Sequence, residues 1–126
     1  MPGNLFIRTG GAKDLNEVAK NIFALINVAI IETRYSENAP GGRYLYGEVL
    51  GLRVTLSEAD DTEFPTYDFL MEFRPKFDWG TVDPHCLDGF ADILARYLAR
   101  HGLRIARPLE FGKIGTSTVR YGDKDM

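Results

Sequence analysis

Two segments of this 126-residue chain place an apolar residue at every second position, and this pattern limits how the chain can fold. Successive side chains of a β-strand point to opposite faces, so each segment predicts a strand with one buried face and one face in water. We expect the two strands to pair antiparallel, and Pro75, which lacks a backbone N–H, to end the second. The first has Leu50, Leu52, Val54 and Leu56 on one face and Gly51, Arg53, Thr55 and Ser57 on the other; the second has Tyr67, Phe69, Met71 and Phe73 on one face and Asp68, Leu70, Glu72 and Arg74 on the other.

Other stretches rich in β-branched and aromatic residues predict further strands. Residues 28–35 form one of them and lead into a loop at 36–42, after which a strand region runs on into the first alternating segment. Gly47 and Gly51 interrupt this long strand, where we expect a bulge or a close approach of another backbone. Shorter strands are predicted at 4–9, 103–106 and 116–121.

Two further segments carry a helical repeat. In the first, Asp14 and Glu17 resemble a capping box that begins a helix. The second is expected to run from Asp83-Pro84, an N-cap residue followed by proline, to a stop at Gly102. Spacings of three and four put the apolar residues on one face of each helix. They are Leu15, Val18, Ala19, Ile22, Phe23 and Ile26 in the first, and Leu87, Phe90, Ile93, Leu94, Tyr97 and Leu98 in the second.

The elements follow one another as strand, helix, a run of strands, helix and strands. This order predicts an α+β fold in which an antiparallel sheet is packed by two amphipathic helices. The chain is long enough to bury one core, and no repeat or linker divides it, so we expect a single domain, residues 1–126. The order of the strands in the sheet does not follow from the pattern.

Features of the whole chain indicate where it works. No run of about 18 apolar residues, the length that crosses a bilayer, is present. The first residues, Met1 to Asn4, lack the basic and apolar regions of a signal peptide. The single cysteine, Cys86, has no partner for an internal disulfide, as is usual in a reducing compartment. We therefore expect a cytoplasmic protein that does not bind membranes.

Charge is unevenly distributed along the chain. The net charge is −3, but residues 32–92 hold thirteen acidic and five basic residues, a net charge of −8. A protein that binds nucleic acid neutralises phosphates with a concentrated basic surface. We therefore expect no direct binding of nucleic acid.

The chain shows no complete catalytic or metal-binding motif. His85 and His101 are sixteen residues apart at opposite ends of the second helix, and consecutive side chains such as His85 and Cys86 diverge by about 100° on a helix. Cys86 lies in no recognisable nucleophile signature. The glycine pairs at 10–11 and 41–42 match no phosphate-binding loop and are explained by turns. We predict a protein that is not an enzyme and holds no cofactor and no metal.

Carboxylates are concentrated in the loop between the two alternating segments. Residues 57–68 contain five of them and no lysine or arginine, together with Phe64 and Tyr67. In one interpretation the two aromatic side chains only attach the loop to the core. In the other they are anchors in an acidic recognition surface for a basic partner. Asp68 and Glu72, on the wet face of the second strand, are also explained by charge pairing with Arg53 or Arg74.

The same part of the chain resembles segments of small bacterial immunity proteins. The resemblance lies in Gly47 to Val54, then Glu58 to Pro65, and then Tyr67-Asp68-Phe69. Such proteins belong to contact-dependent inhibition and related polymorphic-toxin systems, in which each neutralises one cognate toxin domain. The resemblance implies a cytoplasmic, non-enzymatic protein that binds its toxin tightly, often by covering the active site of a nuclease with an acidic surface.

Charge and resemblance together predict an immunity protein that binds and neutralises a cognate toxin domain with a basic surface, a nuclease being the expected type. One alternative is a hydrolase that uses the acidic cluster to bind a divalent metal. Another is an adaptor domain that dimerises through an open sheet edge. The sequence indicates neither the toxin nor the oligomeric state. The residues predicted to contact the partner are Glu58, Asp60, Asp61, Glu63, Phe64, Asp68 and Glu72.

Overall fold

The two alternating segments form neighbouring antiparallel strands in a computed structural model of the chain, which describes residues 3–9, 14–49, 51–75, 84–109 and 117–122. They are β4 (Leu52–Glu58) and β5 (Phe69–Pro75). Their register places Leu56 opposite Met71 and Val54 opposite Phe73, and all four side chains are buried. The antiparallel pairing and the buried face predicted for these strands are therefore confirmed.

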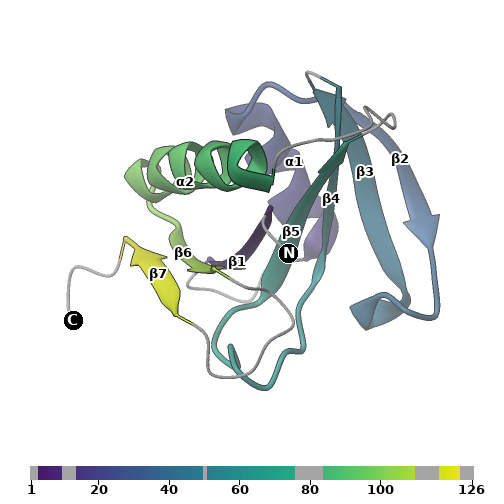
Figure 1. Cartoon of the computed structure of the whole chain (residues 1–126). Helices are drawn as coiled ribbons and strands as arrows, with labels where there is room; N and C mark the ends of the chain where they lie inside the picture. Colours follow the sequence, from purple (N-terminus) through teal and green to yellow (C-terminus); the bar gives the residue numbers. More distant parts are fainter. Residues whose placement is uncertain (1–2, 10–13, 50, 76–83, 110–116, 123–126) are drawn as a thin grey trace.

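In the described part of the chain, seven strands form one antiparallel sheet, and two helices pack on it (Figure 1). The α+β fold with an antiparallel sheet is as predicted. The strand order is β2-β3-β4-β5-β1-β6-β7, so the first strand of the chain lies inside the sheet. The remaining elements are β1 (Asn4–Arg8), α1 (Leu15–Leu25), β2 (Ile30–Tyr35), the 3-10 turn Pro40–Gly42, β3 (Arg43–Val49), α2 (Pro84–Arg100), β6 (Arg104–Pro108) and β7 (Thr118–Tyr121).

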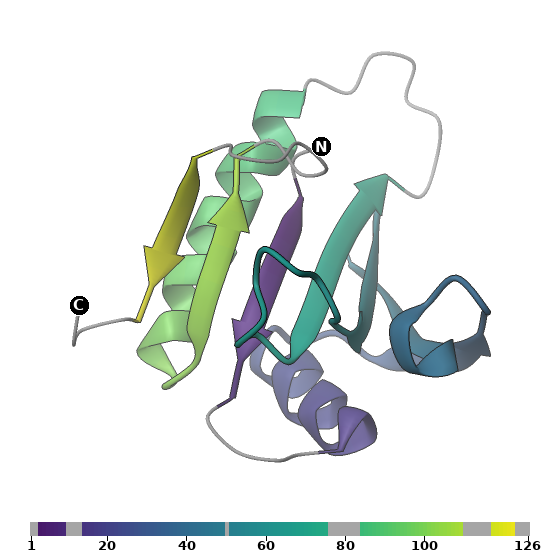
Figure 2. The same cartoon turned by 90° about the horizontal axis from the view of Figure 1, so that it is seen from below.

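Both helices lie against the same face of the sheet. Helix α2 contacts β6, β1 and β7, while α1 contacts β3 and β4. Their buried side chains form one apolar cluster with strand residues such as Leu5, Leu56 and Met71. Seen from below, α2 lies behind β1 and β6, and the loop between β4 and β5 passes in front of the sheet (Figure 2). We call the face turned away from the helices the open face.

The two helices bury their predicted residues to different extents. Helix α1 buries five of its six predicted apolar residues, and Ile26 is half-buried. In α2 the prediction is partly wrong, because Ile93 and Tyr97 are 69% and 41% exposed. The buried stripe passes instead through Ala91 and Ala95, whose small side chains let the helix lie close to the sheet. Neither helix is long and apolar enough, within the described residues, to span a bilayer.

The predicted ends of the helices are partly confirmed. Asp14 is the N-cap residue of α1, but its side chain makes no capping hydrogen bond. Its carboxylate accepts a hydrogen bond from Arg43 at 3.2 Å instead, so the predicted capping box does not form. Gly102 follows α2 with a φ of 89°, as expected for a helix stop. Asp83 and the glycine pair at 10–11 lie outside the described residues.

The long strand predicted through Gly47 and Gly51 is two strands joined by a hairpin. Val49 of β3 pairs with Leu52 of β4, so the chain reverses between them. Gly51 has a φ of 75°, a left-handed conformation that glycine adopts without steric cost. The close approach predicted at Gly47 is confirmed, since a Cβ atom there would lie 2.8 Å from the carbonyl oxygen of Ala29.

A polar network joins α2 to β6 and β7 on the helix side of the sheet. The side chain of Arg107, 9% exposed, pairs with Asp88 and donates a hydrogen bond to the Tyr121 hydroxyl at 2.9 Å. Tyr121 donates in turn to Asp92 Oδ1 at 2.7 Å. This hydrogen bond lowers the pKa of Asp92, and hydrogen bonding with Arg96 adds to the effect. Burial raises the pKa of Tyr121.

Candidate functional site

The acidic loop, residues 59–68, connects β4 to β5 on the open side of the sheet. Backbone hydrogen bonds hold both of its ends. The Ala59 N–H donates to the Asp68 carbonyl at 2.8 Å, and the Asp68 N–H donates to the carbonyl of Ile7 in β1 at 3.0 Å. Backbone hydrogen bonds therefore fix the loop to β1, a central strand of the sheet.

Aromatic side chains fix the middle of the acidic loop. The Phe64 ring stacks on Phe6 of β1 with 4.3 Å between ring centroids, and Tyr67 meets Phe64 edge-on at 6.2 Å. With Ala106 of β6 they form a second apolar cluster, distinct from the helix-side core. Phe64 is only 7% exposed, which favours the interpretation that the two aromatic side chains attach the loop to the core. Tyr67 differs from prediction, because it packs in this second cluster and not in the helix-side core with Phe69.

The carboxylates around the loop have a different environment from its aromatic rings. Asp61 is half-buried, and its Oδ1 accepts a hydrogen bond from the Glu63 N–H at 2.8 Å. No ion pair joins these carboxylates to another described residue. Their negative charge is therefore uncompensated in the described part of the chain. The exposed members are Glu58, Asp60, Glu63 and Asp68.

Glu72, the last residue of the predicted site, lies apart from the acidic loop. It is in β5, opposite Thr55 of β4, and its carboxylate forms an ion pair with Arg74 at 2.8 Å. The prediction offered Arg53 or Arg74 as its partner, and the contact is with Arg74. Arg53 is instead directly opposite Arg74. The loop carboxylates thus follow one another between β4 and β5, while Glu72 lies among the arginines of a neighbouring cavity.

The acidic residues do not form a metal centre among the described residues, where no three side chains of His, Cys, Asp or Glu are grouped to hold an ion.

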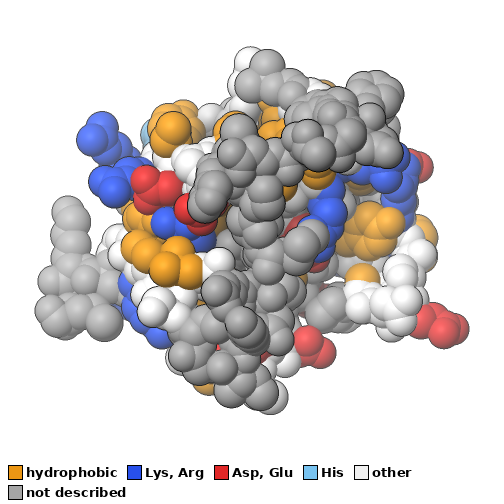
Figure 3. Space-filling view, viewed as in Figure 1, with side chains coloured by type: hydrophobic (Ala, Val, Ile, Leu, Met, Phe, Trp, Pro, Cys, Tyr) orange, Lys and Arg blue, Asp and Glu red, His pale blue; other side chains and the backbone are white. Residues whose placement is uncertain are grey.

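A cavity of about 560 Å³ lies on the open face over β2, β3, β4 and β5. Its floor consists of three rows of side chains that lie opposite one another on neighbouring strands. The rows are Arg53 with Arg74, Thr55 with Glu72, and Tyr44 with Ser57 and Leu70. In the space-filling view, basic side chains lie beside hydrophobic ones over β2 to β4 (Figure 3).

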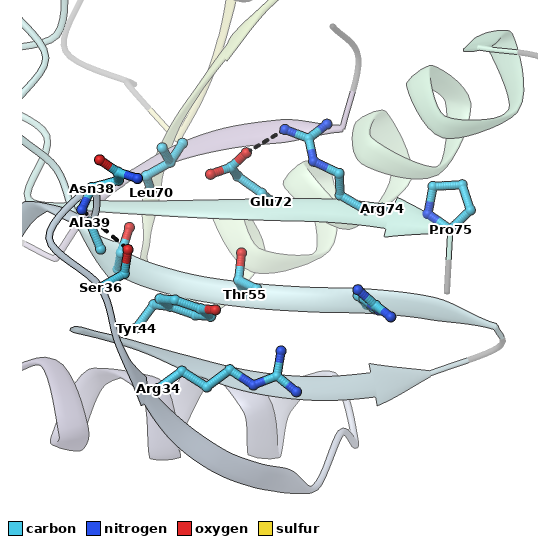
Figure 4. Close-up of a pocket in the computed structure, with 12 residues that line it drawn as sticks. Arg34, Ser36, Asn38, Ala39, Tyr44, Thr55, Leu70, Glu72, Arg74 and Pro75 are labelled. Atoms are coloured by element: carbon cyan, nitrogen blue, oxygen red, sulfur yellow. Dashed lines mark hydrogen bonds and ion pairs between the residues drawn. The ribbon is translucent and has the colours of Figure 1, made fainter. Parts of the chain in front are cut away.

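Arg34 completes the cavity from the edge strand β2, where it is paired with Tyr44 of β3. Its guanidinium forms an ion pair with Glu32 at 2.6 Å and lies 4.2 Å from the centroid of the Tyr46 ring. The hydrogen bond to Glu32 raises the pKa of Arg34. Figure 4 shows side chains that line the cavity from three strands: Arg34 on β2, Tyr44 on β3, and Glu72, turned toward Arg74, on β5. We call this cavity, lined by Arg34, Arg53 and Arg74, the arginine cavity.

The three arginines differ in their partners. Arg34 and Arg74 each pair with a glutamate two residues away on their own strand. Arg53 is exposed and pairs with no carboxylate of the described residues. The nearby Glu48 accepts a hydrogen bond from the Tyr46 hydroxyl, which raises the pKa of Tyr46. Glu48 of β3 lies directly opposite Arg53 in the sheet, but the two form no ion pair.

Sequence reasoning missed the arginine cavity. The alternation placed Arg53 and Arg74 on the wet faces of their strands, which the structure confirms. The missing information was the register, because only the pairing of β4 with β5 puts the two arginines side by side. Recognising a hairpin at Gly51 would also have predicted that β4 pairs with β3, the strand that carries Tyr44.

Comparison of the chain with family models, curated proteins and solved structures found no match.

Proposed function

We propose that this chain is an immunity-type inhibitor that binds a cognate toxin domain and neutralises it with its acidic loop. The observation that supports the proposal is a set of exposed carboxylates, without ion pairs in the described residues, on a loop held against β1. The resemblance of residues 47–69 to immunity proteins supplies the kind of partner. The contact residues proposed are Glu58, Asp60, Asp61, Glu63 and Asp68, without Phe64 and Glu72.

The physical basis of the proposal is electrostatic complementarity with a preorganised loop. Clustered charge of one sign steers a partner of opposite sign and accelerates association. The aromatic cluster of Phe6, Phe64 and Tyr67 holds the loop in place before binding. A loop that is already ordered loses less conformational freedom when it docks, so more of the interaction free energy remains as affinity.

Charge reversal in the loop tests this proposal. The partner to use is the purified product of the neighbouring open reading frame, which this proposal expects to encode a toxin domain. We expect Asp60→Lys with Glu63→Lys to slow association about tenfold, because steering by charge governs the on-rate. Surface plasmon resonance at low salt would measure this rate. Glu17→Lys with Glu37→Lys is the matched control, since it changes the net charge equally at exposed positions outside the loop.

Salt gives a second readout of the same proposal. Exposed charges are screened beyond about 8 Å at physiological ionic strength, so association with wild type should slow as salt rises. The loop variant should lose most of this dependence, while the control variant keeps it. Equal association rates for the two variants would contradict the acidic loop as the docking surface.

A further inference from the structure

The arginine cavity contains two like charges in an arrangement that is unfavourable by itself. Arg53 of β4 and Arg74 of β5 are directly opposite each other in the sheet. Side chains at such positions have Cβ atoms about 4.5–5.5 Å apart, and like charges there destabilise a sheet. Glu72 forms an ion pair with Arg74, whereas Glu48, directly opposite Arg53 on its other side, forms no ion pair with it. An anion bound between the two guanidinium groups would relieve their repulsion.

The geometry of this arginine pair favours phosphate as the anion. A guanidinium group offers several N–H donors in a planar fork, which matches the oxygens of a phosphate group. Two neighbouring forks can engage one phosphate from two sides. Arg34 adds a third guanidinium across the cavity, although Glu32 accompanies it.

The rest of the cavity indicates what is attached to the phosphate. The middle row, Thr55 and Glu72, provides a hydroxyl and a carboxylate that suit the hydroxyl groups of a ligand. The far row adds Tyr44 and Leu70, which offer an aromatic ring and an apolar surface. Four residues along a strand span about 13 Å, so the basic and apolar ends are separated by the length of a small organic molecule.

The size and walls of the cavity agree with a small ligand. Its volume of about 560 Å³ lies within the range of roughly 300–1,000 Å³ that is usual for such sites. Ser36, Asn38 and Ala39, from the loop after β2, form a side wall beside the floor of strands (Figure 4).

From these features we propose that the arginine cavity binds a small phosphorylated molecule of the mononucleotide class. The phosphate lies between Arg53 and Arg74, the sugar hydroxyls lie over Thr55 and Glu72, and the base lies against Tyr44. This site is separate from the acidic loop and does not depend on the function proposed above.

Titration calorimetry with adenosine 5′-monophosphate, adenosine and ribose 5-phosphate tests the proposal. We expect saturable binding of the nucleotide, and binding of adenosine about tenfold weaker or worse because a charge-assisted contact is lost. Ribose 5-phosphate should bind between the two, and inorganic phosphate should compete with the nucleotide. If no phosphorylated compound binds up to millimolar concentration, or if adenosine binds as well as its monophosphate, the proposal is overturned.

A variant of Arg53 locates the binding. Arg53→Gln removes an exposed side chain with no ion pair among the described residues, so the protein should fold normally. It should weaken nucleotide binding about tenfold. Arg100→Gln is the matched control, because Arg100 is exposed on α2, on the other side of the sheet. Equal affinities in the two variants would overturn the site even if the nucleotide binds.

Discussion

The two faces of strand β5 show how differently the two sides of this sheet are used. Phe69, Met71 and Phe73 point to the helices and are at most 3% exposed. Alternating with them, Leu70, Glu72 and Arg74 face the open side and are half-buried. One face of the strand is thus covered by helices, and the other borders a polar cavity and an acidic loop.

The open face is itself divided. Over β1 and β6, Phe64 and Tyr67 of the acidic loop cover Phe6 and Ala106. Over β2 to β5 the floor is polar and basic, and the arginine cavity lies there. The helix side, with the larger buried cluster, therefore contributes most of the stability of the fold, while the open side carries charge of both signs available for binding. Mutations on the two sides should therefore have unequal effects on stability.

The largest difference is expected within β4. Leu56→Ala removes a side chain with 0% exposure from the helix-side core, and the lost burial and the cavity it leaves should destabilise the protein by about 3 kcal/mol. Its neighbour Thr55 faces the open side, so Thr55→Ala should change stability by less than about 0.5 kcal/mol. Urea unfolding of both variants measures this. Similar losses of stability in the two variants would contradict the conclusion that the helix side stabilises the fold more than the open side.

An intermediate effect is expected at the second cluster. Phe64→Ala should cost about 2 kcal/mol, below the cost of a core phenylalanine, because the cluster around this ring is much smaller than the helix-side core. The amides of Ala59 and Asp68 should exchange hydrogen faster as the loop loosens. Thr66→Ala, at an exposed position in the same loop, is the control. If Phe64→Ala leaves exchange at Ala59 and Asp68 unchanged, the ring does not hold the loop.

The helix-facing side could be predicted from sequence in large part because it depends on local pattern. Alternation correctly assigned Leu56 and Met71 to the core, and Gly102 marked the end of α2. Alternation did not predict the position of Tyr67, because β5 begins only at Phe69. The Tyr67 side chain packs instead in the cluster around Phe6, which lies some sixty residues earlier in the chain.

The candidate sites differ in the same way. The acidic loop is contiguous, so its charge could be predicted directly from residues 57–68. Whether Phe64 is buried remained open between two interpretations, because its partner Phe6 lies on a strand whose place in the sheet the pattern did not indicate. The arginine cavity gathers Arg34, Arg53 and Arg74 from three strands, and only the register joins them.

The smallest effect is expected in the polar network on the helix side, and it depends on pH. The pKa of Asp92 is lower in the folded chain than its ordinary value of 3.8, so this carboxylate stabilises the fold above that pH. As the pH falls through 3.8, the unfolded state takes up the proton first and this stability is lost.

Between about pH 5 and pH 3, Asp92→Asn should therefore lose less stability than wild type does, and the difference should be no more than about 1 kcal/mol. Tyr121→Phe keeps the carboxylate but removes the hydrogen bond that chiefly lowers its pKa, and should also reduce the slope. Urea unfolding at the two pH values measures both, and an unchanged slope in both variants would show that the network does not couple Asp92 to folding.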